Sequence, residues 1–173
     1  MIDLVPPTPA LYDAWAACVV DFGAVHMDGS GHHGPMDTAR PAFDAYLAER
    51  LREADHAWEP PADRVHASYR WMVEGDEVVG FVGIRHRLTP FLLEQGGHVG
   101  YAVRPSRRRE GHATAALART LPLCVRLGIA RVLVTCAEDN VGSRRTIERN
   151  GGVLEDVRAG TLRFWIDAAR PPA

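Results

Sequence analysis

The stretch GYAVRPSRRREGHATAAL at 100–117 carries residue types that suit the binding of an anionic ligand. Three consecutive arginines, Arg107–Arg109, are followed by Gly111 and by the small residue Ala113. A helix that begins here has unpaired backbone N–H groups and a partial positive charge at its start. Gly111 and Ala113 leave room for a pyrophosphate beside that backbone, and the arginines add bidentate donors. The pattern predicts a diphosphate site; the alternative is a solvated basic turn.

The segments on either side of this turn have the patterns that such a site requires. Residues 98–104, HVGYAVR, predict a strand that leads into the turn. Residues 111–127 have apolar positions at helical spacing, among them Leu117 and Leu121, and Gly128 is suited to end the helix. The diphosphate site would therefore lie between a strand and the helix that follows it.

The rest of the chain predicts an α/β fold with a mostly antiparallel mixed sheet, in the order β-α-α-β-β-β-α-β-α-β-β. Its 173 residues suit one domain, which we place at 1–173. The remaining expected strands are 2–5, 68–73, 77–88, 131–137, 153–157 and 161–167, and the remaining expected helices are 9–22, 41–54 and 140–149.

Composition argues against several other classes of protein. No apolar run approaches the roughly 20 residues of a membrane helix, and the start MIDLVPPTPA lacks a secretory signal pattern, so we expect a cytoplasmic protein without membrane contact. Three scattered cysteines predict buried thiols, not a disulfide framework or a zinc site. One short basic patch in a chain of net charge −2 gives little support for nucleic-acid binding.

A second glycine-rich stretch, GSGHHG at 29–34, matches the GxGxxG pattern in letters only. Pro35, Met36 and Asp37 follow it in place of a helix of small residues. We interpret the stretch as a mobile loop on the substrate side. The nearby histidines, His26, His32 and His33, lack carboxylate or thiolate partners at a metal-ligand spacing, so we expect no metal site.

Two motifs resemble those of the GNAT acetyltransferase superfamily. Arg108-x-x-Gly111-x-Ala113 matches the acetyl-CoA motif [Q/R]-x-x-G-x-[G/A], and Asn140 and Ser143 match an N-x-x-S element that follows the fifth strand. Between residues 70 and 166 the chain looks like a subgroup of predicted bacterial GNAT acetyltransferases. The runs that carry this likeness are GFVGIRHRL, GGHVGYAVRPSRRREGHA, LVTCAEDNVGSRRTIERNGG and RFWI.

This resemblance implies an N-acetyltransferase that uses acetyl-CoA as cosubstrate and a small-molecule or peptide amine as acceptor. The strands at 98–104 and 131–137 should splay apart, so that the backbone of Tyr101, Ala102 and Val103 can pair with the pantetheine arm. Asn140 and Ser143 should contact that arm, and a homodimer is common in the superfamily. The residues implied around the pyrophosphate are Arg108, Arg109, Glu110, Gly111, His112, Ala113 and Thr114.

Catalysis needs a proton acceptor for the amine, whose pKa is about 10.4, and a donor to the tetrahedral oxyanion. Many GNAT enzymes place a tyrosine acid seven residues after the motif asparagine, where this chain has Ile147. Tyr101 or water could replace that acid. His98 is the first candidate for the base; the alternative is a buried imidazole bonded to backbone. Alternation puts His98 and Tyr101 on opposite strand faces, unless a bulge changes the register.

Three residues at the end of the strand at 77–88, Arg85, His86 and Arg87, could bind an acidic group of the substrate, or could form an exposed strand end. The missing tyrosine also leaves open a protein that binds CoA without catalysis, as a sensor or partner module. Turnover of acetyl-CoA with amines distinguishes that module from an enzyme. A nucleic-acid binder is a third hypothesis, and its affinity would fall steeply with salt.

Overall fold

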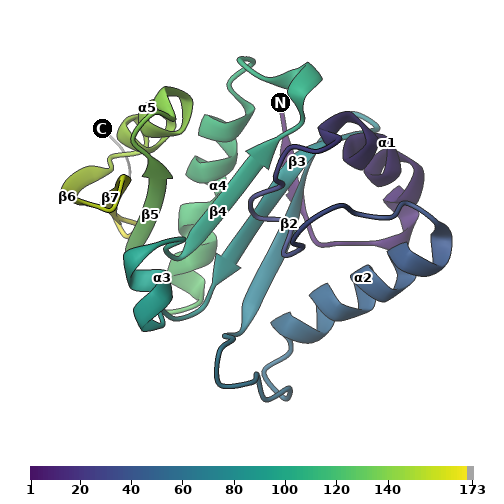
Figure 1. Ribbon diagram of the computed structural model, residues 1–173, viewed down its shortest axis with the longest axis horizontal. Coiled ribbons are helices and arrows are strands. Elements are labelled where there is room, and N and C mark those ends of the chain that lie inside the picture. Colours follow the sequence, from purple (N-terminus) through teal and green to yellow (C-terminus); the bar gives the residue numbers. More distant parts are fainter. Residues whose placement is uncertain (171–173) are drawn as a thin grey trace.

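The computed structural model describes residues 1–170, and its helices and strands follow the expected order with one addition (Figure 1). The addition is a short helix, α3 (Pro90–Glu94), in which Thr89 accepts a hydrogen bond from Leu92 N (3.2 Å). The helix expected at 9–22 begins as a 3-10 turn, Pro9–Leu11. The other helices are α1 (Tyr12–Phe22), α2 (Arg40–Ala54), α4 (His112–Arg126) and α5 (Val141–Arg149), and a second 3-10 turn spans Pro105–Arg107.

The strands form two sheets, and β4 and β5 are the strands at which the sheets adjoin. The first has the order β1-β2-β3-β4 and the second the order β5-β7-β6, and every pairing within them is antiparallel. The arrows of β4 and β5 run in the same direction in Figure 1, and the sheets separate between them, as predicted. The strands are β1 (Asp3–Val5), β2 (Ala67–Glu74), β3 (Glu77–Arg85), β4 (Val99–Val103), β5 (Arg131–Ala137), β6 (Val153–Arg158) and β7 (Thr161–Asp167).

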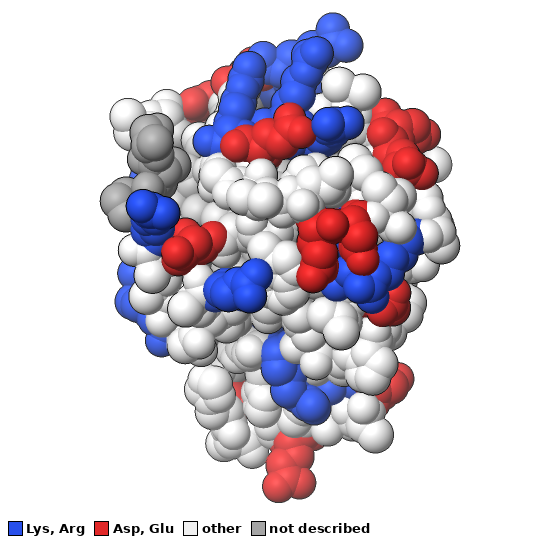
Figure 2. Space-filling view, turned by 90° about the vertical axis from the view of Figure 1, so that its left-hand side faces the viewer, with Lys and Arg blue, Asp and Glu red and all other residues white. Residues whose placement is uncertain are grey.

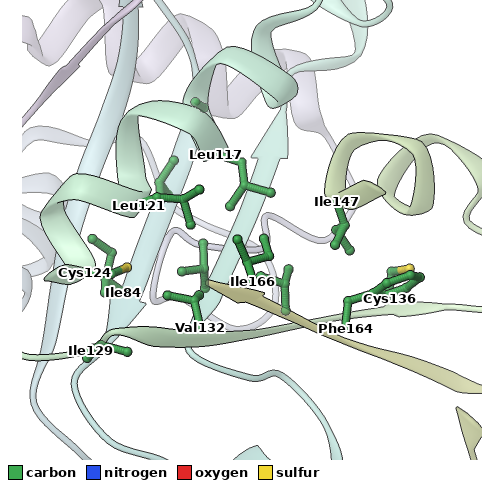
Figure 3. Packing of buried hydrophobic residues seen from close by; sticks show 14 of the residues in the cluster. Ile84, Leu117, Leu121, Cys124, Ile129, Val132, Cys136, Ile147, Phe164 and Ile166 are labelled. Atoms are coloured by element: carbon green, nitrogen blue, oxygen red, sulfur yellow. The ribbon is translucent and has the colours of Figure 1, made fainter. Parts of the chain in front are cut away.

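Two hydrophobic cores hold these layers together. Helices α1 and α2 cover one face of the first sheet, where Trp15 and Phe43 pack against Trp71 and Phe81. Helix α4 covers the other face and also reaches the second sheet. Figure 3 shows Leu117, Leu121 and Cys124 of α4 in the same cluster as residues of β3, β5 and β7. Burial of one such side chain stabilises a fold by roughly 1.5–3 kcal/mol. Because α4 buries side chains against both sheets, its packing holds the two sheets in a fixed relation.

The sheets touch just before β4 begins. His98 N donates to Leu133 O of β5 (2.8 Å), and Gly96 N donates to Thr135 Oγ1 (3.0 Å). Gly97, at a φ of +60°, brings its Cα so close that a Cβ would lie 2.5 Å from Leu133 O. Beyond this junction the two strands diverge, and the cleft described below opens between them.

Cys18, Cys124 and Cys136 are free and buried, which confirms the prediction of unpaired thiols. Within residues 1–170, no helix combines the length and apolar character needed to cross a membrane.

Candidate active site

A cleft of about 1200 Å³ lies where the two sheets separate. Its walls are β4, the end of β5, the start of α4 and one side of α5, and the loop between α1 and α2 adds three residues. All of the residues that the sequence predicts around the cofactor line this cleft, except Glu110. Of the residues predicted for catalysis or substrate binding, His98, His86 and Arg87 do not line it. The fold therefore gathers segments that lie far apart in the sequence around one space.

The edge of β4 that faces the cleft is unpaired backbone. At the two ends of the strand, His98 O accepts from Arg85 N (2.7 Å) and Arg104 N donates to Val79 O (2.9 Å). Since antiparallel pairs alternate, the even-numbered residues of β4 bond to β3 and the odd-numbered residues present N–H and C=O groups to the cleft. These odd-numbered residues are Val99, Tyr101 and Val103.

The β3–β4 register runs without a shift from the pair Ile84–Val99 to the pair Gly80–Val103. The sequence left open a bulge in the strand that contains His98 and Tyr101. No such bulge is present between β3 and β4. A straight open edge of this kind can add one further extended chain, as in other cases of strand addition.

The start of α4 offers unpaired N–H groups to the same cleft. Gly111 is the N-cap at a φ of +85°, a left-handed conformation that favours glycine, and no side chain caps the helix. The preceding Arg109 also has a positive φ, of +67°. Helix α4 spans 15 residues, so its N-terminus carries a full dipole, and Ala113 and Thr114 of its first turn line the cleft. An anion is the ligand that such a helix end binds best.

The three neighbouring arginines of the turn differ in what they can reach. Arg107 is bound by Glu74 (2.5 Å), Glu77 and Glu110 (3.0 Å), so its charge is already neutralised by this acidic cluster. These ion pairs engage the side chain of Glu110, which does not line the cleft, so any contact of Glu110 with the pyrophosphate would come from its backbone N–H. Arg108 Nε donates to Val103 O (3.1 Å), and within residues 1–170 no ion pair engages Arg108 or Arg109.

Positively charged side chains gather at the end of the molecule that contains the turn between β4 and α4. Figure 2 shows the basic groups projecting at the top, the end at which the loop between β4 and α4 lies in Figure 1. Arg145 and Arg149 of α5 also line the cleft, although the sequence analysis did not single them out. Their spacing of four residues, which places both on one helix face, was the available signal.

Comparison with known proteins agrees with this geometry. The profile of the acetyltransferase (GNAT) domain family matches residues 2–153. This chain belongs to the GNAT acetyltransferase family. It is 29% identical over 69 residues to the uncharacterized N-acetyltransferase YjdG of Bacillus subtilis (strain 168), a match that spans 39% of the chain and 40% of the relative's length.

Two solved GNAT structures share the fold. RimJ of Mycobacterium smegmatis, in complex with CoA-disulfide, has a TM-score of 0.72 at 22% identity and covers 97% of this chain and 82% of its own. RimL, a ribosomal L7/L12 alpha-N-protein acetyltransferase with coenzyme A bound as a disulfide to one of its cysteines, has a TM-score of 0.67 at 16% identity. That match covers 96% of this chain and 95% of RimL.

The acid position of many GNAT enzymes is occupied by a core residue here. Ile147 is fully buried between α4, α5 and the second sheet (Figure 3), and it does not line the cleft. Tyr101 does line it, and its hydroxyl lies 2.8 Å from Ser143 Oγ at the start of α5. Burial raises the pKa of Tyr101 above its ordinary value. Asn140 caps the same helix by accepting from Ser143 N (3.0 Å).

His98 has the environment of a structural histidine. It is 7% exposed, and its Nδ1 accepts a hydrogen bond from Leu133 N (2.9 Å). Burial, with a smaller effect of Arg85, lowers the pKa of His98 to about 4. Because Nδ1 already accepts a proton donor, Nε2 carries the ring's hydrogen and no basic nitrogen is free. The structure thus favours the alternative of a buried imidazole bonded to backbone, and it corrects the choice of His98 as base.

Only one of the three residues expected to bind substrate reaches the cleft. Arg85 lines it, but its NH1 donates to the carbonyl oxygens of Gly96 (2.9 Å) and Gly97 (3.3 Å), and burial lowers its pKa. His86 lies 2.8 Å from Ser68 Oγ outside the cleft, and its pKa falls to about 4 through burial. Arg87 is exposed at the strand end.

Proposed function

We propose that this GNAT acetyltransferase binds acetyl-CoA in the cleft and transfers the acetyl group to an amine by direct attack. The observation that carries the proposal is the uncapped N-terminus of α4, which opens into the same cleft as the unpaired edge of β4. The helix end suits the pyrophosphate, and the strand edge suits the amides of the pantetheine arm. RimJ and RimL, which share the fold, are both bound to CoA species.

In this arrangement the cofactor crosses the whole cleft. Arg108, Arg109 and the first N–H groups of α4 hold the pyrophosphate, with Arg145 and Arg149 adding charge from α5. The backbone of Tyr101 and Val103 pairs with the pantetheine amides, with Asn140 and Ser143 on the opposite wall. The thioester then lies toward the start of β4, where a free backbone N–H of the strand edge can donate to the tetrahedral oxyanion.

Tyr101 serves as the hydrogen-bond donor to the leaving sulfur. Its raised pKa keeps the phenol protonated. A thiol has an ordinary pKa of about 8.5, lower than that of the phenol, so a strong hydrogen bond to the thiolate is favoured over complete proton transfer. The thiolate can then take its final proton from the product side or from water.

The test is release of free CoA thiol from acetyl-CoA in the presence of a panel of amines that includes peptide N-termini and polyamines. The chain contains no lysine, so acetylation of its own side-chain amines cannot contribute a background. Ala113→Glu puts a carboxylate where the pyrophosphate binds, and Ala118→Glu makes the same change on an exposed part of α4. We expect Ala113→Glu to lose acetyl-CoA binding at least tenfold and Ala118→Glu to retain it. Equal binding by both variants would refute the placement of the cofactor.

A second candidate function is a CoA-binding module without turnover, which the burial of Ile147 in the core favours. Tight binding of acetyl-CoA together with no thiol release across the whole panel would support the module. Release of thiol with any amine would support the enzyme.

A further inference from the structure

The loop between α1 and α2 lies directly on the first sheet, because three glycines from separate segments leave no side chain between them. Gly29, at a φ of +82°, lies against Gly83 of β3 and Gly100 of β4. A Cβ on Gly29 would be 2.4 Å from Gly100 O and 2.9 Å from Gly83 N, so only glycine permits this approach. The loop therefore meets β4 one residue away from both Val99 and Tyr101, which offer their backbone to the cleft.

The residues that follow Gly29 are fastened on the side away from the cleft. Ser30 O accepts from the hydroxyl of Tyr46 (2.9 Å), and Gly31 O accepts from the guanidinium of Arg50. Arg50 is 2% exposed and is itself paired with Glu53 (3.3 Å). These contacts contradict the mobile loop that the sequence suggested, at least for residues 29–31, because both neighbouring layers hold its backbone.

The residues directly before this fixed segment include a histidine and a carboxylate that the proposed mechanism does not use. His26 and Asp28 both line the cleft, and Nε2 of His26 lies 3.3 Å from Oδ1 of Asp28. Their side chains are 54% and 65% exposed, so both are open to a ligand and to water. The negative charge of Asp28 beside Nε2 favours the tautomer with its hydrogen on that nitrogen, which leaves the lone pair of Nδ1 free, in contrast to the engaged Nδ1 of His98.

We infer that His26, oriented by Asp28, is the base that takes a proton from the acceptor amine; this inference rests on the proposed acetyl transfer. Gly29, the residue after Asp28, lies at the Gly100 end of β4, roughly 10 Å along the strand from Val103, at about 3.3 Å per residue, and Nε2 of His26 lies 3.3 Å from the Asp28 carboxylate. The pyrophosphate end of the cleft begins beyond Val103, so the pair lies at the opposite, thioester end. The carboxylate of Asp28 also makes this end attractive to a cationic amine.

The proton balance of the reaction is complete with these groups. The acceptor ammonium gives one proton to Nδ1 of His26, and the resulting amine attacks the thioester carbonyl carbon to form a C–N bond. When the tetrahedral intermediate collapses, the C–S bond breaks and the thiolate leaves with the electron pair. The nitrogen loses a second proton, which matches the one taken up by the thiolate. The exposed imidazole returns its own proton to water, so each turnover releases one proton.

The other charged groups around the pair do not compete for this role. Arg85 of β3 is bound to the carbonyls of Gly96 and Gly97 and is a cation in any case. His33 stacks on His26 with ring centroids 5.9 Å apart, but it does not line the cleft. His33 therefore offers a matched control, because it is a histidine of the same loop beside the proposed base.

The experiment compares the wild type with His26→Ala, Asp28→Asn and His33→Ala at pH 7.5. Each protein is assayed with the best alkylamine of the panel and with the O-alkylhydroxylamine of matching chain length, which is a much weaker base and is unprotonated at this pH. We expect His26→Ala to lower kcat about 100-fold with the alkylamine and much less with the O-alkylhydroxylamine. Added imidazole should restore part of the lost rate, and acetyl-CoA affinity should stay unchanged. Asp28→Asn should show a smaller loss of the same kind, and His33→Ala should behave like the wild type.

The outcomes separate the two proposals. If the wild type binds acetyl-CoA but turns over no amine, the proposed transfer fails, and the role of His26 fails with it. If the wild type turns over and His26→Ala keeps its rate, only the inference about His26 is overturned. An equal loss with the alkylamine and the O-alkylhydroxylamine, without rescue by imidazole, would likewise overturn it, because a merely structural role would affect both acceptors alike.

Discussion

Replacing His98 by asparagine tests whether this residue acts in stability or in catalysis. The Asn side-chain oxygen can accept from Leu133 N as Nδ1 does, but it does not titrate. In the fold the pKa of His98 falls from 6.5 to about 4, because burial disfavours the charged ring. The folded pKa is thus below the unfolded one, so the contribution to stability is complete above pH 6.5 and is lost as the pH falls toward 4. Linkage over this window gives a loss of about 2 kcal/mol at pH 5 and at most ~3 kcal/mol below pH 4.

The assay is urea unfolding of the wild type and His98→Asn at pH 7.5 and pH 5. We expect the free energy of unfolding of the wild type to fall by about 2 kcal/mol more than that of the variant. His86, whose pKa is also about 4, is present in both proteins and cancels in the comparison. Turnover at pH 7.5 should stay within a few-fold of the wild type. The same pH dependence in both proteins, or a 100-fold loss of turnover in a folded variant, would refute the reasoning.

Three further predictions concern the cleft and its walls. Tyr101→Phe keeps the buried ring but removes the phenol donor, so kcat should fall roughly 10- to 100-fold while the KM for acetyl-CoA changes little; an unchanged kcat would mean that the hydroxyl only bonds Ser143. The double variant Arg145→Glu, Arg149→Glu should raise the Kd for acetyl-CoA at least tenfold in calorimetry at low salt, and less at high salt. Arg144→Glu, whose guanidinium is already paired with Glu148 (2.8 Å), is the control and should have a small effect; equal effects would indicate a general response to charge. Gly29→Ala should destabilise the fold more than Gly34→Ala in thermal unfolding and should lower turnover. Both glycines have a φ of +82°, so the penalty of about 1–2 kcal/mol for a left-handed alanine is the same in the two variants. The difference in stability between the variants therefore reports the clash of the new Cβ with Gly100 O. Equal destabilisation would show that the contact does not fix the loop.

The sequence by itself determined the local parts of this protein. A basic turn with Gly111 between an apolar strand and an amphipathic helix is a pattern of neighbouring residues, and the structure has the strand, the turn and the helix in that order. The same is true of the helix predicted at 140–149, which the structure begins at Val141 with Asn140 as its N-cap. Such features depend on backbone conformations and spacings within a few residues, which the letters express directly.

Only the tertiary structure decided which side chains are free to do chemistry. His98 differs from His26 because Leu133, 35 residues away, occupies its ring nitrogen. Arg107 differs from Arg108 because glutamates of the β2–β3 hairpin lie beside it. Gly29 places its loop at β4 because glycines of two distant strands leave space there. Each of these contacts joins segments whose spacing in the chain carries no information about their distance, since it is the packing of α1, α2 and α4 on the sheets that brings them together.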